Sequence, residues 1–352
     1  MKITRGMDRE ATRRPMSTKQ QDWWTREGDP ERGFRYVGLN GQPLSAERKL
    51  ARIDALVIPP AWTEVHISPD PKRKIQAFGR DQRDRKQYIY SEQAVADRDA
   101  RKWNRVLKVA RSLPALRAAT NTDLQRPELD REKVLATVVR LMTRAYFRAG
   151  SERYAVENRT FGICTLKKKH LDIRGRSLHF SYTGKRSKDQ RQVVADTPLV
   201  EIVEELMELP GPRLFQYQVE RKRRPVTAED VNSYIREVLG QKVTSKDLRT
   251  FGGTVRAATV LADIGPAKSE REAHKNVVMT CRLVASELGN TPAICRKAYI
   301  HPAVLEEYES AGRTVDSDAA RAAAKHPQVE SREPLDYYPE EKALISFLEA
   351  YG

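Results

Sequence analysis

Cysteines and metal-binding patterns are scarce in this sequence. Only three cysteines occur among 352 residues, at Cys164, Cys281 and Cys295, and none of them forms a CxxC pair. We therefore expect neither a disulfide framework nor a zinc ribbon, and we interpret all three as small buried side chains. The six histidines are scattered, without the i, i+4 spacing of a helical metal pair. These absences predict a protein that works without a metal ion.

Phosphate loops and membrane segments are also missing. The glycine pair Gly252 and Gly253 lies inside a helical pattern, where a packing role is expected rather than nucleotide binding. No apolar run of about 20 residues occurs, and no basic amphipathic stretch has a clean apolar face. The N-terminal residues are charged throughout and lack the apolar stretch of a signal peptide. We expect no nucleotide cofactor, no membrane partner and a cytoplasmic location.

Positive charge is what the sequence has in excess. Lys and Arg number 64 against 48 Asp and Glu, which gives a formal net charge of +16. Such an excess is typical of proteins that bind a polyanion, and nucleic acid is the leading candidate. The cations gather in residues 167–191 and again in 221–224, and runs of this kind neutralise phosphates. Any single one of these side chains could equally be a solvated surface charge, but their clustering favours DNA or RNA as the binding partner.

The spacing of apolar residues divides the chain near residue 95. Before this point apolar residues alternate with a period of two, and after it the period is nearer 3.6. The length of 352 residues itself suggests two domains. We predict an α+β protein in which a small, mainly β domain precedes a mostly helical domain with a small inserted sheet. The expected parts are an N-terminal arm (1–33), the β-rich domain (34–95), the helical domain (96–312) and a linker with a last helix (313–352).

Local signals place the elements of the first domain. Residues 34–44 predict a hairpin around Asn40-Gly41, a pair that tolerates the positive φ of a tight turn. Val65 and Ile67 alternate with polar residues in a further strand, and residues 74–81 and 86–91 predict two more. No structure is assigned to residues 1–33, apart from a packing role for the two tryptophans at 23 and 24.

The second domain carries clear helix signals. An apolar face predicts a helix from Asp130 to Gly150, and alternation around residues 178–182 with a Gly184-Lys185 turn predicts the inserted sheet. Capping patterns begin three more helices. Thr291-Pro292 begins a short one that leads to Tyr299. The caps are Thr227 with Asp230, Thr244 with Asp247, and Ser269 with Glu272. The C-terminal tail is expected to contain an Ala-rich stretch (319–324), a linker (327–334) and a helix from Glu340 to Tyr351.

One segment, IQAFGRDQRDRKQYIY (75–90), mixes amides and tyrosines with basic residues. Amides and arginines are the side chains that read base edges in the major groove, while Lys and Arg hold phosphates. A charged edge hairpin would have the same composition, so that alternative stays open. The expected DNA contacts of this segment are Gln76, Arg80, Gln87, Tyr88 and Tyr90.

Six blocks carry a resemblance to a known family. They are IPPAWTEV, IQAFGRD with KQYIY, YFRAGSERYAVENRTFGICTLKKKH, SYTGK, KDLRTFGG and the segment from Asn290 to Tyr299. In this order, over most of residues 34–310, they resemble the type IB DNA topoisomerases, specifically the compact poxvirus-like and bacterial branch. The resemblance implies an enzyme, independent of ATP and metal, that relaxes supercoiled duplex DNA through a 3′-phosphotyrosyl intermediate, strand rotation and religation. It implies a nucleoid-associated protein that clamps around the duplex, and we expect a monomer because no long heptad or large exposed apolar segment appears.

The same resemblance assigns the catalytic residues. Tyr299 takes the place of the nucleophile, Arg148 and Arg249 of the arginines that grip the phosphate, and Lys185 of the general acid on a turn. Where the family has a histidine this chain has Asn290, which keeps a hydrogen-bond donor but has no titrating proton. Further contacts to DNA are expected from Lys167, Lys169 and Lys246.

Other interpretations stay open at this point. Arg148 alone could be a helix C-terminal cation, Arg249 a partner of Asp247 or Asp263, Asn290 a helix cap, and Tyr299 a core side chain. A tyrosine recombinase shares the phosphotyrosine chemistry, and the order Tyr299-Ile300-His301 echoes its Y-x-H pattern. Against it stand Lys246, where recombinases usually have histidine, and the β-rich first domain. A noncatalytic basic DNA-binding protein is the third alternative.

Overall fold

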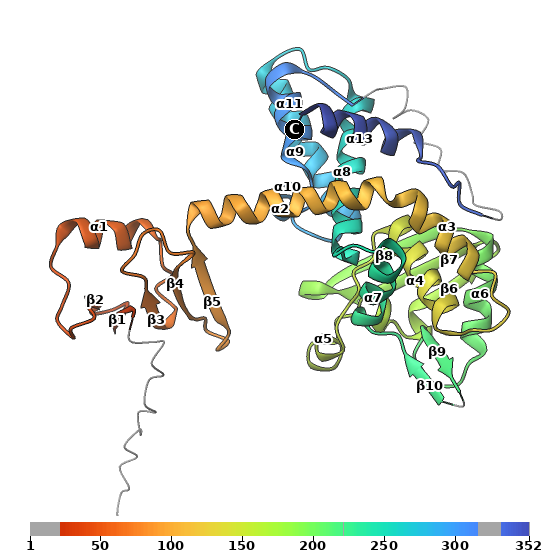
Figure 1. The fold of residues 1–352 in the computed structure, drawn as a ribbon, viewed down its shortest axis with the longest axis horizontal. Helices are drawn as coiled ribbons and strands as arrows, with labels where there is room; N and C mark the ends of the chain where they lie inside the picture. Colours follow the sequence, from red (N-terminus) through yellow and green to blue (C-terminus); the bar gives the residue numbers. More distant parts are fainter. Residues whose placement is uncertain (1–21, 221, 316–331, 352) are drawn as a thin grey trace, which may run out of the picture. The chain divides into compact units, whose positions relative to one another are not determined.

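The structure is a computed structural model that describes residues 22–220, 222–315 and 332–351 (Figure 1). The chain forms two compact units, Met1–Arg101 and Lys102–Gly352. One helix, α2 (Glu92–Arg111), begins in the first unit and ends in the second. Within the described residues, no helix is both long enough and apolar enough to cross a membrane. The expected α+β class is confirmed, with a sheet in the first unit and helices with small sheets in the second.

The first unit is a five-stranded antiparallel sheet with one helix beside it. The strand order is β2-β1-β3-β4-β5. Alternation places Val65 and Ile67 of β3 on the buried face, where they pack with Trp24 and with Ile53 of the helix. The elements are β1 (Trp24–Asp29), β2 (Gly33–Val37), α1 (Glu47–Ala55), β3 (Thr63–Ile67), β4 (Ile75–Arg80) and β5 (Lys86–Tyr90).

Two expectations for this unit were wrong. Strand β1 lies inside the stretch 1–33 to which no structure was assigned, because burial of Trp24 in the core draws this segment into the sheet. Strand β2 pairs back with β1 rather than forward across Asn40-Gly41, and the expected turn closes only a single bridge between Val37 and Pro43. Helix α1 was not expected at all. The part of the predicted arm from 1 to 21 lies outside the described residues.

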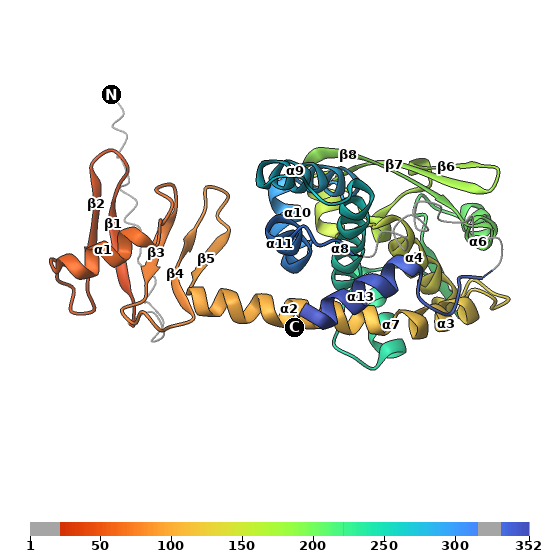
Figure 2. The same ribbon diagram turned by 90° about the horizontal axis from the view of Figure 1, so that it is seen from above.

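The second unit is built around α4 (Arg131–Ala145), which is buried along nearly its whole length. The sheet β6-β7-β8 packs on one side of this helix and α7 on another; Figure 2 shows the strands along one side of the unit and α3 and α7 along the other. The helix begins after Asp130, whose carboxylate accepts a hydrogen bond from the Lys133 amide, and ends at Tyr146 with φ 53° rather than at Gly150. The remaining elements are α3 (Leu113–Asp123), α5 (Glu152–Glu157), β6 (Leu171–Arg174), β7 (Ser177–Gly184), β8 (Lys188–Ala195), α6 (Thr197–Glu208), β9 (Gln216–Val219), β10 (Lys222–Pro225), α7 (Ala228–Leu239), α8 (Ser245–Ile264), α9 (Glu270–Glu287), α10 (Pro292–Ala298), α11 (Pro302–Ala311) and α13 (Pro339–Tyr351).

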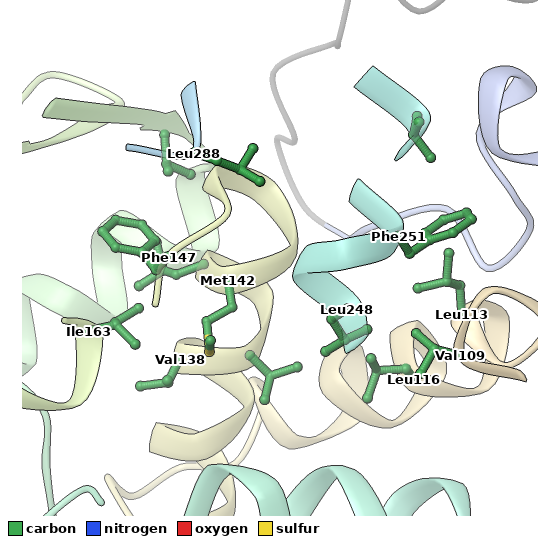
Figure 3. Packing of buried hydrophobic residues seen from close by; sticks show 14 of the residues in the cluster. Val109, Leu113, Leu116, Val138, Met142, Phe147, Ile163, Leu248, Phe251 and Leu288 are labelled. Atoms are coloured by element: carbon green, nitrogen blue, oxygen red, sulfur yellow. The ribbon is translucent and has the colours of Figure 1, made fainter. Parts of the chain in front are cut away.

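One apolar core joins the helices of the second unit. Figure 3 shows Met142 of α4 and Phe251 of α8 among the side chains of this cluster. Helix α8 is buried over most of its length, so its position is fixed on several sides by packing. Residues on α8 are therefore held rigidly, and the site described below is built on this helix.

The predicted caps are present, one of them incomplete. Thr227 with Asp230 and Thr244 with Asp247 form full capping boxes at α7 and α8. At α9 the Ser269 hydroxyl accepts from the Glu272 amide, but the Glu272 carboxylate accepts from the amide of Lys268 instead of Ser269. Thr291 caps α10 through the Ile294 amide, as its sequence predicts.

The C-terminal segment returns to the body of the second unit. Helix α13 packs against α8. Arg117 of α3 donates two hydrogen bonds to the Glu341 carboxylate, at 2.8 and 2.9 Å, and both side chains are nearly buried. The Ala-rich stretch 319–324 and residues 327–331 of the expected linker lie outside the described residues.

Candidate active site

Tyr299 lies immediately after α10 and is half-buried. Its amide donates to the Cys295 carbonyl at 3.0 Å, and its own carbonyl accepts from Oγ1 of Thr254 at 3.3 Å. A Cβ atom on Gly253 would lie 2.9 Å from this same carbonyl oxygen. Helix α8 thus approaches the Tyr299 backbone closely because glycine stands at this position.

Arg249 of α8 lies beside the Tyr299 ring, with its guanidinium carbon 5.4 Å from the ring centroid. The side chain is 4% exposed and donates from Nη2 to the Leu288 carbonyl. The pKa of Arg249 is lowered to about 10, first by burial and then by the positive charge of Arg148, while the Tyr299 phenol offsets part of the effect. Arg249 keeps its charge at neutral pH, and among the described residues it forms no ion pair with a carboxylate.

Arg148 and Asn290 contact each other directly. Nη2 of Arg148 donates to Oδ1 of Asn290 at 2.5 Å and to the carbonyl of Gly289 at 2.9 Å. Arg148 lies in the loop after α4, and Asn290 lies in the turn between α9 and α10. Four residues from three distant stretches of the sequence therefore meet, and two of them are cations held close to each other.

Two buried donors in this cluster lack a partner among the described residues. They are Nε of Arg249 and Nδ2 of Asn290. A buried donor without an acceptor costs about 1–3 kcal/mol, so its presence in a folded protein needs a reason. An anion with several oxygens would satisfy both donors and would offset the repulsion between the guanidiniums of Arg148 and Arg249.

Lys185 is placed at the turn between β7 and β8, where it is exposed. The structure does not bring it into contact with the other four residues. Its turn is nevertheless held beside them, because Nζ of Lys188 donates to the Asn290 carbonyl at 3.0 Å. The Gln190 side chain also packs on Gly289, where any Cβ would collide with it.

The predicted DNA-contacting residues of the first unit differ in how exposed they are and in whether they already have a hydrogen-bond partner. Tyr88 and Tyr90 of the edge strand β5 are exposed, with ring centroids 6.0 Å apart. Arg80 pairs with Glu64 and Asp84, and Gln87 donates to Asp81.

Gln76 has a different environment from the other residues of its segment. It is 4% exposed, accepts from Arg52 and donates to main-chain oxygens of residues 70, 71 and 73. Its amide is fully used inside the domain, so Gln76 has a structural role and is not free to contact DNA.

The predicted contacts in the second unit lie on its surface. Lys167 and Lys169 line a pocket of about 810 Å³ together with Arg159 and Arg213. Lys246 is exposed in the first turn of α8, three residues before Arg249. All three lysines are open to a ligand.

Sequence reasoning did not find the residues that hold the nucleophile segment. Gly253 and Thr254 fix the Tyr299 backbone, while Lys188 and Gln190 hold the turn of Lys185. The glycine pair was the one available signal, and the packing role expected for it is what the structure shows: Gly252 faces the Tyr146 ring and Gly253 faces Tyr299.

The fold and the cluster define a helical unit that holds a phenol beside two guanidiniums and an amide. Comparison with known proteins gives the family. The model for the eukaryotic DNA topoisomerase I catalytic core matches residues 84–326, and the model for the bacterial DNA topoisomerase IB N-terminal domain matches residues 33–81. The chain belongs to the type IB DNA topoisomerase family, and its first unit is of the bacterial kind.

Two viral relatives agree with this assignment. DNA topoisomerase 1B of Acanthamoeba polyphaga mimivirus is 30% identical over 285 residues, covering 79% of this chain and 85% of its own. DNA topoisomerase 1B of Vaccinia virus (strain Copenhagen) is 26% identical over 263 residues, covering 72% and 76%. A solved structure of the XerH site-specific recombinase bound to difH substrate covers 56% of this chain and 53% of its own, at 16% identity and a TM-score of 0.34.

Proposed function

We propose that this protein relaxes supercoiled duplex DNA by cutting one strand with Tyr299, letting the free end rotate, and resealing the break. The observation that carries the proposal is that four residues from three separate parts of the chain meet. Arg148 contacts Asn290, and Arg249 lies beside the phenol ring. Family membership supports the same activity.

The chemistry follows from the residues present. The phenolic oxygen of Tyr299 attacks a phosphorus, forms a 3′-phosphotyrosyl ester and displaces the 5′-oxygen. Negative charge builds on the nonbridging oxygens, where Arg148 and Arg249 supply charged donors and Asn290 a neutral one. The ester conserves the energy of the broken bond, so the reverse attack by the 5′-hydroxyl reseals the strand without a nucleotide or metal.

The leaving 5′-oxygen needs a proton, and we infer that Lys185 supplies it. Its turn includes Arg186 and Ser187 with φ of 64° and 54°, and it is exposed to an incoming strand. Lys188 and Gln190 keep the base of the turn against residues 289 and 290. We infer that DNA binding brings Lys185 to the leaving oxygen.

Contacts to the duplex come from both units. Tyr88 and Tyr90 offer exposed rings and hydroxyls, and Lys167, Lys169 and Lys246 offer cations to phosphates. Arg80 and Gln87 lie on the same two strands and can exchange their present carboxylate partners for DNA. The protein then acts in the cytoplasm as a monomer closed around double-stranded DNA, associated with the nucleoid.

The test is relaxation of supercoiled plasmid in chelator, without nucleotide. We expect relaxation by the wild-type chain, and no relaxation with unchanged DNA binding by Tyr299→Phe. Denaturing gels of reactions stopped midway should show protein linked covalently to the 3′ end of the DNA strand at the nick. Mapping of the linked peptide should identify Tyr299. Relaxation by Tyr299→Phe would contradict the proposal, and exchange between two specific sites in place of relaxation would indicate a recombinase.

A further inference from the structure

Helix α2 contacts the segment that carries Tyr299. Nζ of Lys102 donates to the carbonyl of Lys297, at the end of α10, at 3.3 Å. The same ammonium lies 3.6 Å from the centroid of the Trp103 ring. The Trp103 ring in turn lies 4.7 Å from the His301 ring. Two consecutive residues of α2 thus touch the chain on both sides of the nucleophile.

His301 connects this contact to the backbone of Tyr299. Its amide donates to Oγ1 of Thr254 at 3.1 Å, and the same hydroxyl donates to the Tyr299 carbonyl. Its Nδ1 accepts from the Ala303 amide at 3.2 Å and so caps α11. Burial, together with the charge of Lys102, lowers the pKa of His301 to about 4, so the ring is neutral and can keep this acceptor role. Residues 299–303 are therefore held between α8 on one side and Trp103 on the other.

A third residue of α2 contacts the helix that carries Arg249. Nε of Arg105 lies 3.5 Å from Oδ1 of Asp247, whose side chain is 5% exposed. Asp247 forms the capping box at the beginning of α8, two residues before Arg249. Helix α2 thus contacts residues within two positions of Tyr299 and within two positions of Arg249.

We propose that Lys102, Trp103 and Arg105 are positioning residues through which α2 aligns Tyr299 with Arg249. This inference rests on the proposed function, because it needs Tyr299 to be the nucleophile. Helix α2 also begins in the first unit, so the unit that provides Tyr88 and Tyr90 is joined by one helix to the nucleophile segment. A helix is a stiff element, and misplacement of a reacting group by about 1 Å costs on the order of 100-fold in rate.

The experiment measures single-turnover cleavage of a duplex oligonucleotide that loses the short fragment downstream of the cut, which carries the free 5′-hydroxyl, with DNA affinity and melting temperature determined in parallel. Trp103→Ala removes the ring against His301, Trp103→Phe keeps an aromatic ring there, and Lys102→Met removes the donor to Lys297 while retaining an apolar stem. Asn104→Ala and Lys108→Ala are the controls, because both side chains are exposed on the same helix. Tyr299→Phe is measured alongside.

We expect Trp103→Ala to slow cleavage on the order of 10- to 100-fold at saturating DNA, with DNA affinity within about threefold of wild type. Lys102→Met should slow it less, Trp103→Phe should restore most of the rate, and the controls should match wild type. Cleavage at the wild-type rate by Trp103→Ala, or a loss explained wholly by weaker DNA binding or unfolding, overturns the inference while the proposed function stands. Cleavage by Tyr299→Phe overturns the proposed function itself.

Discussion

The carbonyl oxygen of Tyr299 lies 2.9 Å from the position that a Cβ atom on Gly253 would take. Real Cβ contacts of this length with a backbone atom essentially never occur, so a side chain at this position would displace Tyr299. The hydroxyl of Thr254, the next residue, holds the same carbonyl at 3.3 Å. The nucleophile is positioned by a close contact between backbones, and the contact depends on glycine at one position.

Gly253→Ala should therefore reduce DNA cleavage without preventing DNA binding. The methyl group must move the Tyr299 carbonyl by several tenths of an ångström, and we expect a loss on the order of 10- to 100-fold in the single-turnover cleavage rate. Asp263→Ala, at an exposed position near the end of the same helix, is the control. A cleavage rate equal to that of wild type would show that the backbone contact has no part in aligning the phenol.

Asn290→Asp separates the two functions of this side chain. The variant keeps an oxygen for Arg148 but replaces the unpartnered Nδ2 donor with a second oxygen. If Nδ2 donates to a phosphoryl oxygen, cleavage should fall by about 100-fold or more, the usual effect of removing one such donor. Asn290→His, which supplies a donor again, should keep more activity than Asn290→Asp. Equal activity of both variants in the relaxation assay would argue against a donor role.

Lys185→Ala tests the general acid. The expected result is slow cleavage of ordinary DNA, because the 5′-oxygen leaves without a proton. With a sulfur atom in place of the 5′-bridging oxygen the leaving group needs no acid, so the variant should cleave this substrate nearly as fast as wild type. Lys188→Ala serves as comparison, since Lys188 contacts the Asn290 carbonyl rather than the leaving group. A variant equally slow on both substrates would assign Lys185 to DNA binding instead.

Arg117 and Glu341 test the part played by the C-terminal helix in stability. Their side chains are 8% and 12% exposed. Glu341→Ala leaves the Arg117 charge buried without its partner, and we expect a loss of about 3–5 kcal/mol in the free energy of unfolding. The exposed pair of Arg35 and Glu27 should contribute less than about 1 kcal/mol, and Glu27→Ala is the matched control. Urea titration of both variants gives the comparison, and equal losses would exclude a special role for the buried pair.

His301 predicts a pH dependence of stability. Its pKa is lowered to about 4 from the ordinary histidine value of 6.5, so the unfolded chain binds more protons between these values and stability falls as pH decreases from about 6.5 to 4. The full effect is on the order of 2 kcal/mol, allowing for partial exposure. His301→Asn cannot titrate and should lack this part of the slope. Burial raises the pKa of Asp196 to about 6, which acts in the opposite direction, so the difference between wild type and variant is the quantity to measure. An unchanged slope would contradict the assignment.

Much of the fold could be predicted because it depends on local signals. Three helix starts depend only on residues close together in the sequence, and all three were confirmed. They are the capping boxes at Thr227 and Thr244 and the Thr291-Pro292 start of α10. Strand β1 and helix α1 were not predicted because they depend on contacts with residues distant in the sequence. Trp24 of β1 and Ile53 of α1 are buried in one cluster with Val65 and Ile67 of β3. The prediction of a hairpin at Asn40-Gly41 was wrong for the same reason. Strand β2 pairs with β1, which precedes it in the chain, and not with a strand after the turn.

The sequence by itself determined the excess of positive charge, the capped starts of α7, α8 and α10, and the identity of the residues able to carry out phosphoryl transfer. Only the tertiary structure decided that Arg148 would contact Asn290, that Gly253 would lie against Tyr299, and that Gln76 would be used inside its own domain. The physical reason is distance along the chain. A cap or turn depends on atoms a few residues apart, whereas the contact of Trp103 with His301 exists because the packing of α2, α8 and α11 brings together residues that no local pattern relates.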